Sequence, residues 1–316
     1  MATHAPAAPR SPSGAGAPRR RLGGLARQQR RWGMALAVPA VAGYLVFTAA
    51  PMAASLYFSL TDWTIGSSPA FVGLDNVREM LADAQFHKAL RATGLYVLLA
   101  VPASLVSALF AALLLNRAGR SEGAYRTLFY LPVLVPPVAS SVLWLWMFNP
   151  DLGLLNTALR AVGLPSSSWI YAESSVMPSL ALMAAWGFGN TAIIFLAGLK
   201  GVPRELYEAA QCDGAGAFRQ FWSVTLPQLT PIVLFNLVMG MIAGLQVFDQ
   251  AYIMTNGGPN GATNFIVFYL YNKAFKSGDF GYASALAWVL FLVILLVTLV
   301  IFRSARRWVF YEGGKR

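Results

Sequence analysis

The residues that could do chemistry in this chain are few, and they lie inside apolar stretches. Gln246, Asp249 and Gln250 are spaced at i, i+3 and i+4, so on a helix they would share one face. Asn236 precedes them in the same stretch, and Asn190 lies in another. Carboxylates and amides accept hydrogen bonds from hydroxyls, and amides also donate them. We therefore expect these five residues to line a path for a hydroxyl-rich solute.

The alternative role for these residues is structural. Asp249 would then lie at the outer water interface as an ordinary helix end, and Asn236 would hydrogen-bond a neighbouring helix. Polar groups are costly in lipid unless they face a cavity or a partner. Because both interpretations satisfy this rule, the sequence leaves them open.

Other kinds of chemistry are poorly supported. The single cysteine, Cys212, cannot form an internal disulfide, and the two histidines, His4 and His87, are too few and too far apart for a metal site. No G-x-x-x-x-G-K-S/T phosphate loop occurs. No Ser, Cys, His or carboxylate cluster has a catalytic spacing. We therefore expect a non-catalytic chain that itself binds no cofactor and no metal.

The elements that must position the polar residues are membrane helices. Of the 316 residues, 57% are hydrophobic and only 12% are charged, about half the charged fraction of a soluble domain. The mean hydropathy is +0.54, so there is too little polar surface to cover a water-exposed body. The net charge is +11. Because the charges fall in short segments between apolar runs, they indicate membrane topology rather than a nucleic-acid partner.

Six charge-free stretches are long enough to cross a hydrocarbon core, which takes roughly 20 helical residues. We therefore predict an all-α polytopic membrane protein with a transmembrane domain over 32–302. Its six transmembrane helices are expected at about 33–60, 92–116, 127–149, 175–199, 228–250 and 281–302. A seventh charge-free interval contains TNGGPNGATN (255–264), whose Gly, Pro and Asn residues favour turns. We expect an external loop or a re-entrant segment there.

The positions of Lys and Arg predict the orientation. With both termini in the cytoplasm, 18 of the 24 Lys and Arg residues lie on the inner side. Residues 1–31, rich in Ala, Pro, Gly and Arg, are predicted to form a disordered basic cytoplasmic tail, and 303–316 a second tail. The basic residues of the first tail act either as a topology anchor or by binding anionic lipid headgroups. No cleavable signal peptide is expected, because the apolar run after Arg31 is too long for a signal core.

The connection between the fourth and fifth predicted spans, residues 200–227, is patterned and is called the coupling loop below. Pro203 suits the first turn of a helix over Arg204–Asp213, and Gly214 supplies the left-handed residue that commonly ends one. A second short helix is predicted over Phe218–Val224, with Leu226-Pro227 ending it and beginning the next span. The coupling loop is therefore expected to form two helices outside the membrane.

Residues 208–227, EAAQCDGAGAFRQFWSVTLP, resemble the EAA motif of ATP-binding cassette (ABC) importer permeases. The residues that match are Glu208, Ala209, Ala210, Asp213, Gly214, Leu226 and Pro227. The small alanines let a partner approach the helix closely, and the glutamate offers a carboxylate to a donor. The alternatives are a surface helix packed on its own inner loops, or an interfacial helix anchored by Phe218, Phe221 and Trp222.

Further segments are similar to the sugar-importer branch of these permeases, which includes maltose-type and glycerol-phosphate-type systems. They are FVGLDN (71–76), RTLFYLP (126–132), FNPDLGLLN (148–156) and VFDQAYIMTNGGP (247–259). Taken singly, each has a simpler explanation as a helix kink or a turn. Their order along one chain, at suitable distances from the EAA motif, supports the resemblance.

The resemblance implies the ABC type I importer permease fold and a subunit that moves a sugar or sugar derivative across the cytoplasmic membrane by alternating access. It also implies partners: a second homologous permease subunit, two cytoplasmic ATP-binding subunits that use ATP and Mg, and an extracellular or periplasmic solute-binding protein. Membrane lipid is a further partner, and nucleic acid is not. Two alternatives remain: an ion-gradient-driven secondary transporter or channel, whose internal repeats are not evident here, and an integral-membrane enzyme.

Overall fold

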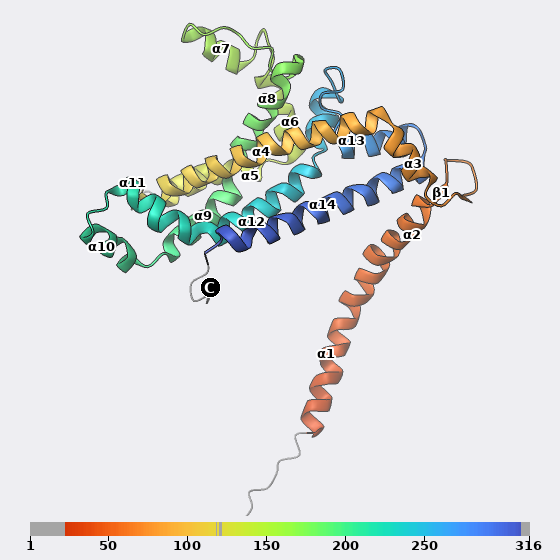
Figure 1. The fold of residues 1–316 in the computed structure, drawn as a ribbon, viewed down its shortest axis with the longest axis horizontal. Coiled ribbons are helices and arrows are strands. Elements are labelled where there is room, and N and C mark those ends of the chain that lie inside the picture. Colours follow the sequence, from red (N-terminus) through yellow and green to blue (C-terminus); the bar gives the residue numbers. More distant parts are fainter. Residues whose placement is uncertain (1–22, 118, 120–121, 311–316) are drawn as a thin grey trace, which may run out of the picture. The chain divides into compact units, whose positions relative to one another are not determined.

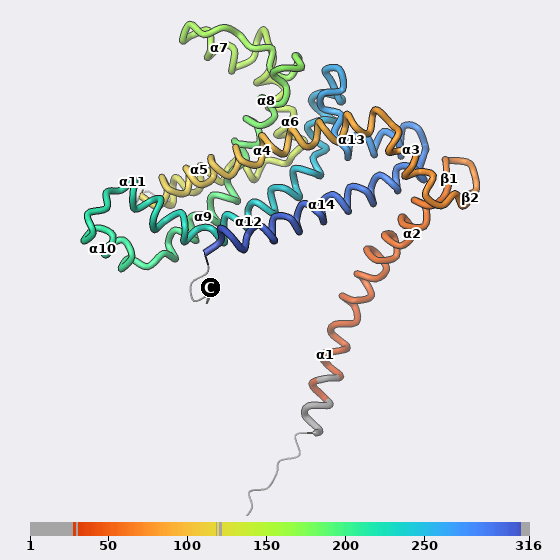
Figure 2. The backbone as a smooth tube through the Cα atoms, viewed as in Figure 1, coloured from red at the N-terminus to blue at the C-terminus, as the bar shows by residue number. Residues whose placement is uncertain are grey.

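The computed structural model describes residues 23–117, 119 and 122–310 (Figures 1 and 2). The chain divides into two units, residues 1–54 and residues 55–316. Most of the predicted N-terminal tail, residues 1–22, lies outside the described residues. Within the described part, helix α1 (Gly23–Tyr44) already begins inside the predicted tail rather than at residue 32. Its first residues, LARQQRR, include good helix formers.

Helix α1 continues through a π-helical turn, η1 (Leu45–Ala49), into α2 (Ala50–Ser59). The turn lies directly before Ala50-Pro51, and the N–H of Ala50 donates to the carbonyl of Leu45. A proline inside a helix lacks an N–H donor and crowds the carbonyl of the preceding turn. The wider π turn shifts the hydrogen-bonding register at this point, so the helix passes the proline without ending.

Four helical stretches are long and apolar enough to cross a membrane: Arg31–Ser59, Ala84–Arg117, Ala217–Thr255 and Phe280–Trp308. Two further pairs of helices are bent. Helices α5 (Glu122–Leu134) and α6 (Pro137–Met147) meet at 95°, and α8 (Glu173–Trp186) and α9 (Gly189–Gly201) meet at 52°. Counting each bent pair as one span gives six. The all-α prediction is confirmed. The spans predicted at 127–149 and 175–199 each correspond to a bent pair of helices.

The two breaks have local causes. At the first, Pro136 is followed by Pro137, and a residue before proline is driven from the helical to the extended region; Pro136 has ψ 145. At the second, Gly187 and Gly189 flank Phe188, and glycine weakens a helix interior. Sequence hydropathy alone does not register either break, because both flanking segments are apolar.

Helix α4 (Ala84–Arg117) lies at the centre of residues 55–316 and packs against α8, α9 and α12 (Leu226–Leu245). Gly240 and Gly244 of α12 allow this close packing, because a Cβ at Gly244 would lie 3.0 Å from Val97 of α4. The largest buried cluster includes residues of α4, α8, α13 (Ile266–Tyr271) and α14 (Phe280–Trp308). Helix α14 itself ends at Trp308, past the predicted end of its span at 302.

Short elements close the end of α4 that carries its first residue. A hairpin pairs β1 (Thr61–Asp62) with β2 (Ala70–Phe71) antiparallel, and α3 (Asp75–Ala82) follows it. Buried Asn76 donates to the carbonyls of Ser59 and Thr61 at 3.0 and 2.9 Å. In Figure 1, α3 and α13 lie at this end of α4, whereas α10 (Arg204–Cys212) and α11 (Ala217–Gln220) lie at the other.

The predicted external segment 255–264 consists of turns. Asn256, Gly257, Asn260 and Gly261 all have positive φ, a region that glycine and asparagine tolerate best. The segment is held at its base by the side chains of Thr255 and Thr263, whose hydroxyls lie 2.6 Å apart. The turn prediction for this stretch is confirmed.

Candidate functional site

A cavity of about 870 Å³ opens among α4, α9, α12 and the segment that follows α12. The structure brings all five predicted polar residues to its wall: Asn190, Asn236, Gln246, Asp249 and Gln250. Asn190 and Gln246 are exposed, and Asp249 and Gln250 are half-buried. The residues that sequence spacing grouped are therefore together in space, although the geometry that groups them differs from the predicted one.

The prediction that Gln246, Asp249 and Gln250 share one continuous helical face is wrong. Helix α12 ends at Leu245, and residues 247 and 248 are not helical. A π-helical turn, η5 (Gln250–Thr255), then begins after Asp249. Buried Val247 and the stacking of Phe248 on Tyr252, with ring centroids 5.2 Å apart, accompany the break. These packing contacts prevail over regular helix geometry, and the polar side chains reach the cavity from both sides of the break.

Asn236 is the most enclosed of the five, with 5% of its surface exposed. Its Nδ2 has no hydrogen-bond partner among the described residues. An unpaired buried donor costs about 1–3 kcal/mol. Asn236 Nδ2 therefore donates to no described neighbouring helix. The structural alternative, in which Asn236 hydrogen-bonds such a helix, gains no support from this donor. Asp249 does lie at a helix end, as its own alternative states, but that end faces the cavity.

Sequence analysis missed several residues of the cavity wall. Tyr96, Tyr130 and Phe248 contribute aromatic rings, and Ser104 contributes a hydroxyl. Tyrosines inside predicted spans were the available signal, because a phenol at membrane depth needs a partner or a cavity. The wall therefore combines hydrogen-bonding groups with aromatic faces, a mixture that is common in small-molecule sites.

A smaller cavity of about 230 Å³ adjoins the first at the two helix breaks. Val135 and Pro137 line it from the α5–α6 break, and Gly187 lines it from the α8–α9 break. Asn190 and Gln250 line both cavities. The bends of the third and fourth spans therefore form one side of the enclosed space.

The first half of the coupling loop folds as predicted, with a helix that ends one residue early. Helix α10 starts after Pro203 and ends at Cys212 instead of Asp213. Gly214 has φ +76. The N–H of Ala215 donates to Ala210 O and the N–H of Gly214 donates to Gln211 O, both at 2.9 Å. This pair of bonds is a Schellman end, which needs a left-handed residue.

The second half of the coupling loop differs from the prediction. No separate helix spans Phe218–Val224; α11 continues through a π-helical turn, η4 (Phe221–Thr225), into α12. Leu226-Pro227 does not end this helix. The N–H of Leu226 donates to Phe221 O, so the π turn accommodates the proline as η1 does in the first span.

Helix α10 projects from the bundle. None of its residues is buried, and Glu208, Ala209, Asp213 and Gly214 are exposed, whereas Ala210 is half-buried. Its side-chain link to the rest of the coupling loop is a 3.0 Å hydrogen bond between the Tyr207 and Thr225 hydroxyls. A helix packed on its own inner loops would bury one face, so this alternative does not fit α10.

The aromatic residues of the coupling loop leave the interfacial alternative open for α11. Phe218 and Trp222 are 79% and 55% exposed, and Phe221 is half-buried. Exposed aromatic rings at the end of a membrane helix are typical of the lipid interface. Leu226 and Pro227 lie half-buried at the base of α12. The EAA residues thus form an exposed helix and a more enclosed base.

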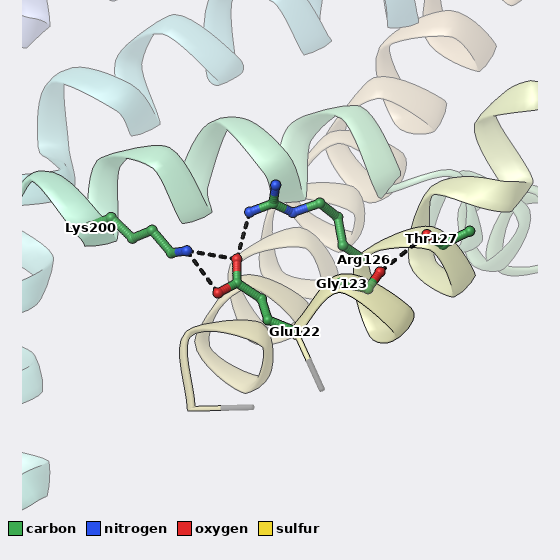
Figure 3. Close-up of polar contacts among 5 residues, drawn as sticks. All are labelled: Glu122, Gly123, Arg126, Thr127 and Lys200. Atoms are coloured by element: carbon green, nitrogen blue, oxygen red, sulfur yellow. Dashed lines mark hydrogen bonds and ion pairs between the residues drawn. The ribbon is translucent and has the colours of Figure 1, made fainter. Parts of the chain in front are cut away.

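A group of charges that sequence analysis missed lies at the same end of the bundle (Figure 3). Lys200 Nζ donates to both carboxylate oxygens of Glu122 at 2.6 and 2.7 Å, and Arg126 donates to Oε1 at 2.5 Å. The Glu122–Arg126 pair could be inferred from its i, i+4 spacing on a helix. Lys200 is 78 residues away from Glu122, so no local pattern reveals it.

A second group, at the opposite end of α4, centres on the carboxylate of Asp83. The hydroxyls of Tyr269 and Tyr282 donate to Asp83 Oδ2, and the N–H of Gln85 donates to Oδ1 at 2.8 Å. Partial burial raises the pKa of Asp83, but the hydrogen bonds from Tyr269, Gln85 and Tyr282 together lower it by more. The pKa of Asp83 is therefore below its usual value. This group ties the start of α4 to α13 and α14.

Comparison with known proteins identifies the fold and the family. Residues 100–309 match the family model described as "Binding-protein-dependent transport system inner membrane component". The chain is 41% identical to the probable ABC transporter permease protein YesP of Bacillus subtilis, over 91% of this chain and 94% of that protein. It is 32% identical to the multiple sugar-binding transport system permease protein MsmF of Streptococcus mutans, over 87% and 96%.

The solved structures agree on the architecture. A chain of a bacterial ABC transporter involved in the import of the acidic polysaccharide alginate matches with a TM-score of 0.77, over 90% of this chain and 98% of that chain, at 23% identity. At this identity the likeness establishes the fold. Together with the apolar helices, the matches show a multi-pass membrane protein. The chain therefore belongs to the binding-protein-dependent inner membrane components, the non-catalytic permease subunits of ABC importers.

Proposed function

We propose that this permease moves a sugar or sugar derivative across the cytoplasmic membrane through the 870 Å³ cavity. The observation that carries this proposal is the convergence of five amide and carboxylate side chains on the wall of one cavity, with the buried Asn236 Nδ2 unpaired among the described residues. A buried donor without a protein partner is available to a hydroxyl of the solute. The Streptococcus mutans relative, named for multiple sugar binding, supports the same substrate class.

The size and chemistry of the cavity fit that substrate. Small-molecule sites commonly enclose about 300–1,000 Å³ and combine apolar walls with a few placed polar groups. In this cavity the polar groups are amides, a carboxylate and hydroxyls, and the apolar part includes the rings of Tyr96, Tyr130 and Phe248. Ring faces pack against the C–H faces of a sugar while the amides bind its hydroxyls. Asn236 on α12 and Gln246 directly after it would contact the solute from one side, and Asn190 on α9 from the other.

The exposed coupling loop supports the proposed ATP-binding partners. Two ATP-binding subunits would use ATP and Mg in the cytoplasm, and one of them would bind α10 through Glu208, Ala209 and Ala210. Asp213 and Gly214 set the end of α10, and Leu226-Pro227 its base. A second homologous permease subunit would complete the pathway, and a solute-binding protein would deliver the sugar on the side opposite α10. Both termini and the coupling loop 200–227 would then be cytoplasmic, with the transmembrane domain at 32–302.

The geometry suggests how alternating access would operate. Helix α10 follows α9 after only two residues, Val202 and Pro203, and α9 lines the cavity with Asn190 and Thr191. Closure of the ATP-binding subunits would displace α10 and with it α9, changing the cavity wall at the break between α8 and α9. To switch the permease almost completely between its inward-open and outward-open states, the ATP-binding subunits must bind one state more tightly by about 5.5 kcal/mol.

Reconstitution tests this proposal. The chain is purified with its second permease and ATP-binding subunits and inserted into liposomes, with the solute-binding protein outside. We expect ATP enclosed in the liposomes to drive uptake of labelled mono- or oligosaccharides, and uptake to persist when ion gradients are collapsed with ionophores. Uptake that needs an ion gradient and no ATP would support a secondary transporter and overturn the proposal. ATP-driven uptake of a non-carbohydrate solute alone would overturn the substrate class.

A further inference from the structure

The carboxylate of Glu122 joins two segments that are far apart in the sequence, at the end of the bundle that carries α10 (Figure 3). Glu122 is the first residue of α5, and Lys200 is the next-to-last residue of α9. The ammonium of Lys200 donates to both carboxylate oxygens, at 2.6 and 2.7 Å. Lys200 lies four residues before Arg204, where α10 begins. The ion pair is therefore next to the point at which α10 joins the bundle.

From this ion pair, α5 and α9 run side by side to the cavity. The rings of Phe129 and Phe188 meet edge to face with centroids 5.7 Å apart. Gly189 packs against α5 so closely that a Cβ would lie 2.6 Å from Val133 Cγ2. Next to these contacts, Tyr130 of α5 and Asn190 of α9 both line the cavity. The two helices are thus joined at one end by charge and at the other by packing.

We propose that the Glu122–Lys200 ion pair is the positioning contact through which a displacement of α10 moves α5 together with α9. The inference rests on the proposed function, because it requires ATP-binding subunits that displace α10. With the pair intact, α5 follows α9, and the α5–α6 bend at the cavity moves with it. Without the pair, α9 moves while the first turn of α5 stays behind, so less of the displacement reaches Tyr130 and the bend.

The expected effect is on transport coupling and not on stability. Both side chains are partly exposed, Glu122 at 23% and Lys200 at 47%, and exposed ion pairs contribute little to folding. A positioning role therefore predicts that the sugar imported per ATP hydrolysed falls while the melting temperature of the complex stays unchanged. A merely structural role predicts that both fall together.

The test uses the complete complex in liposomes and compares Lys200→Gln, Glu122→Gln and the double variant. Each single variant should lower the import per ATP by about fivefold, at the lower end of measured allosteric couplings. The double variant should lose no more than either single variant, because all three remove the same contact. Lys200→Arg, which retains the charge, should restore most of the import. Arg126→Gln is the matched control: it removes the other cation on the same carboxylate, within α5, and should import like the wild type.

Several results would overturn the inference. One such result is that Lys200→Gln and Glu122→Gln import as much sugar per ATP as the wild type. Another is that the fold-loss of the double variant equals the product of the two single fold-losses. A melting temperature that falls in step with import would show a structural role. If the wild-type complex itself shows no ATP-driven uptake, the proposed function fails and the inference fails with it. ATP-driven uptake by the wild type together with unaffected single variants would overturn the inference alone.

Discussion

Gly189 at the start of α9 lies so close to Phe129 of α5 that a methyl group added at Gly189 would meet the Phe129 carbonyl oxygen at 2.7 Å. A carbonyl oxygen in a helix cannot rotate away as a flexible side chain can. The approach therefore depends on the absence of a side chain at position 189. This contact joins α5 of the bent pair α5–α6 to α9 of the bent pair α8–α9, beside the cavity.

Gly189→Ala should destabilise the protein, because the added methyl group forces α5 and α9 apart. Overpacking of this kind costs about 1–3 kcal/mol, measured as a lower melting temperature of the purified complex in detergent. Gly201, at the other end of α9, has open space where a Cβ would lie. The free energy of unfolding of Gly201→Ala should therefore lie within about 0.5 kcal/mol of the wild-type value. Equal melting of the two variants would contradict the close packing.

Asn236→Leu should separate stability from transport. Leucine removes the buried donor that has no partner among the described residues. The free energy of unfolding should therefore stay the same or rise by up to about 1 kcal/mol. Uptake should fall by about tenfold or more, because the solute loses a hydrogen-bonding partner. Thermal unfolding and uptake are measured on the same preparation. Unchanged uptake would remove Asn236 from the path, and a large loss of stability would show that it has a partner in the assembled complex.

Gln246→Ala and Asp249→Ala test the segment after α12. Both side chains face the cavity. Loss of one hydrogen bond typically costs about 0.5–1.5 kcal/mol for a neutral amide and about 1.5–3 kcal/mol for a charged carboxylate. We expect the apparent KM for uptake to rise in each variant, with unchanged amounts of the subunit in the membrane. Ser277→Ala is a control, because Ser277 is exposed and does not line the cavity. Normal uptake by both Gln246→Ala and Asp249→Ala would exclude these residues from the path.

Glu208→Gln should weaken the grip of the ATP-binding subunit on α10, since it removes an exposed carboxylate that can accept charged hydrogen bonds. Gly214→Ala should have a similar effect for another reason: φ +76 strains any residue with a Cβ and disturbs the end of α10. In both variants ATP hydrolysis should continue while uptake falls. Glu205→Gln, also exposed on α10, is the matched control. If Glu208→Gln and Gly214→Ala both transport normally, α10 does not transmit the motion.

The lowered pKa of Asp83 predicts an acid-sensitive contribution to stability. Because the pKa is lower in the folded state than in the unfolded state, near 4, folding is favoured while the carboxylate is ionised. This contribution is complete above pH 4 and is lost as the pH falls through the lowered native pKa. Asp83→Asn should therefore be less stable than the wild type at neutral pH, and the difference should shrink below pH 4.

Melting curves between pH 3 and pH 7 check this prediction. Asp75→Asn is the control, because Asp75 forms only an exposed pair with Arg78 and exposed pairs contribute little to stability. A difference between Asp83→Asn and the wild type that is constant across this pH range would contradict the assignment. It would show that ionisation of Asp83, with hydrogen bonds from the Tyr269 and Tyr282 hydroxyls, does not contribute to the stability of the protein.

Local features of the fold were predictable from the sequence. The apolar stretches, the start of α10 after Pro203, its end before Gly214 and the turns at 255–264 all depend on steric and hydropathic preferences of neighbouring residues. The grouping of Gln246, Asp249 and Gln250 near one another was also a local inference. It held although the helix breaks between them, because residues so close in sequence cannot move far apart.

The tertiary structure alone decided the features that depend on distant contacts. The fifth span breaks where Val247 is buried and Phe248 stacks on Tyr252, and π turns allow helices to pass Pro51 and Pro227. Asn190 meets Asn236 at one cavity, and Lys200 meets Glu122, only because α4, α5, α9 and α12 pack together. Sequence patterns report what each residue prefers near its neighbours. They do not report which surfaces, tens of residues apart, come into contact.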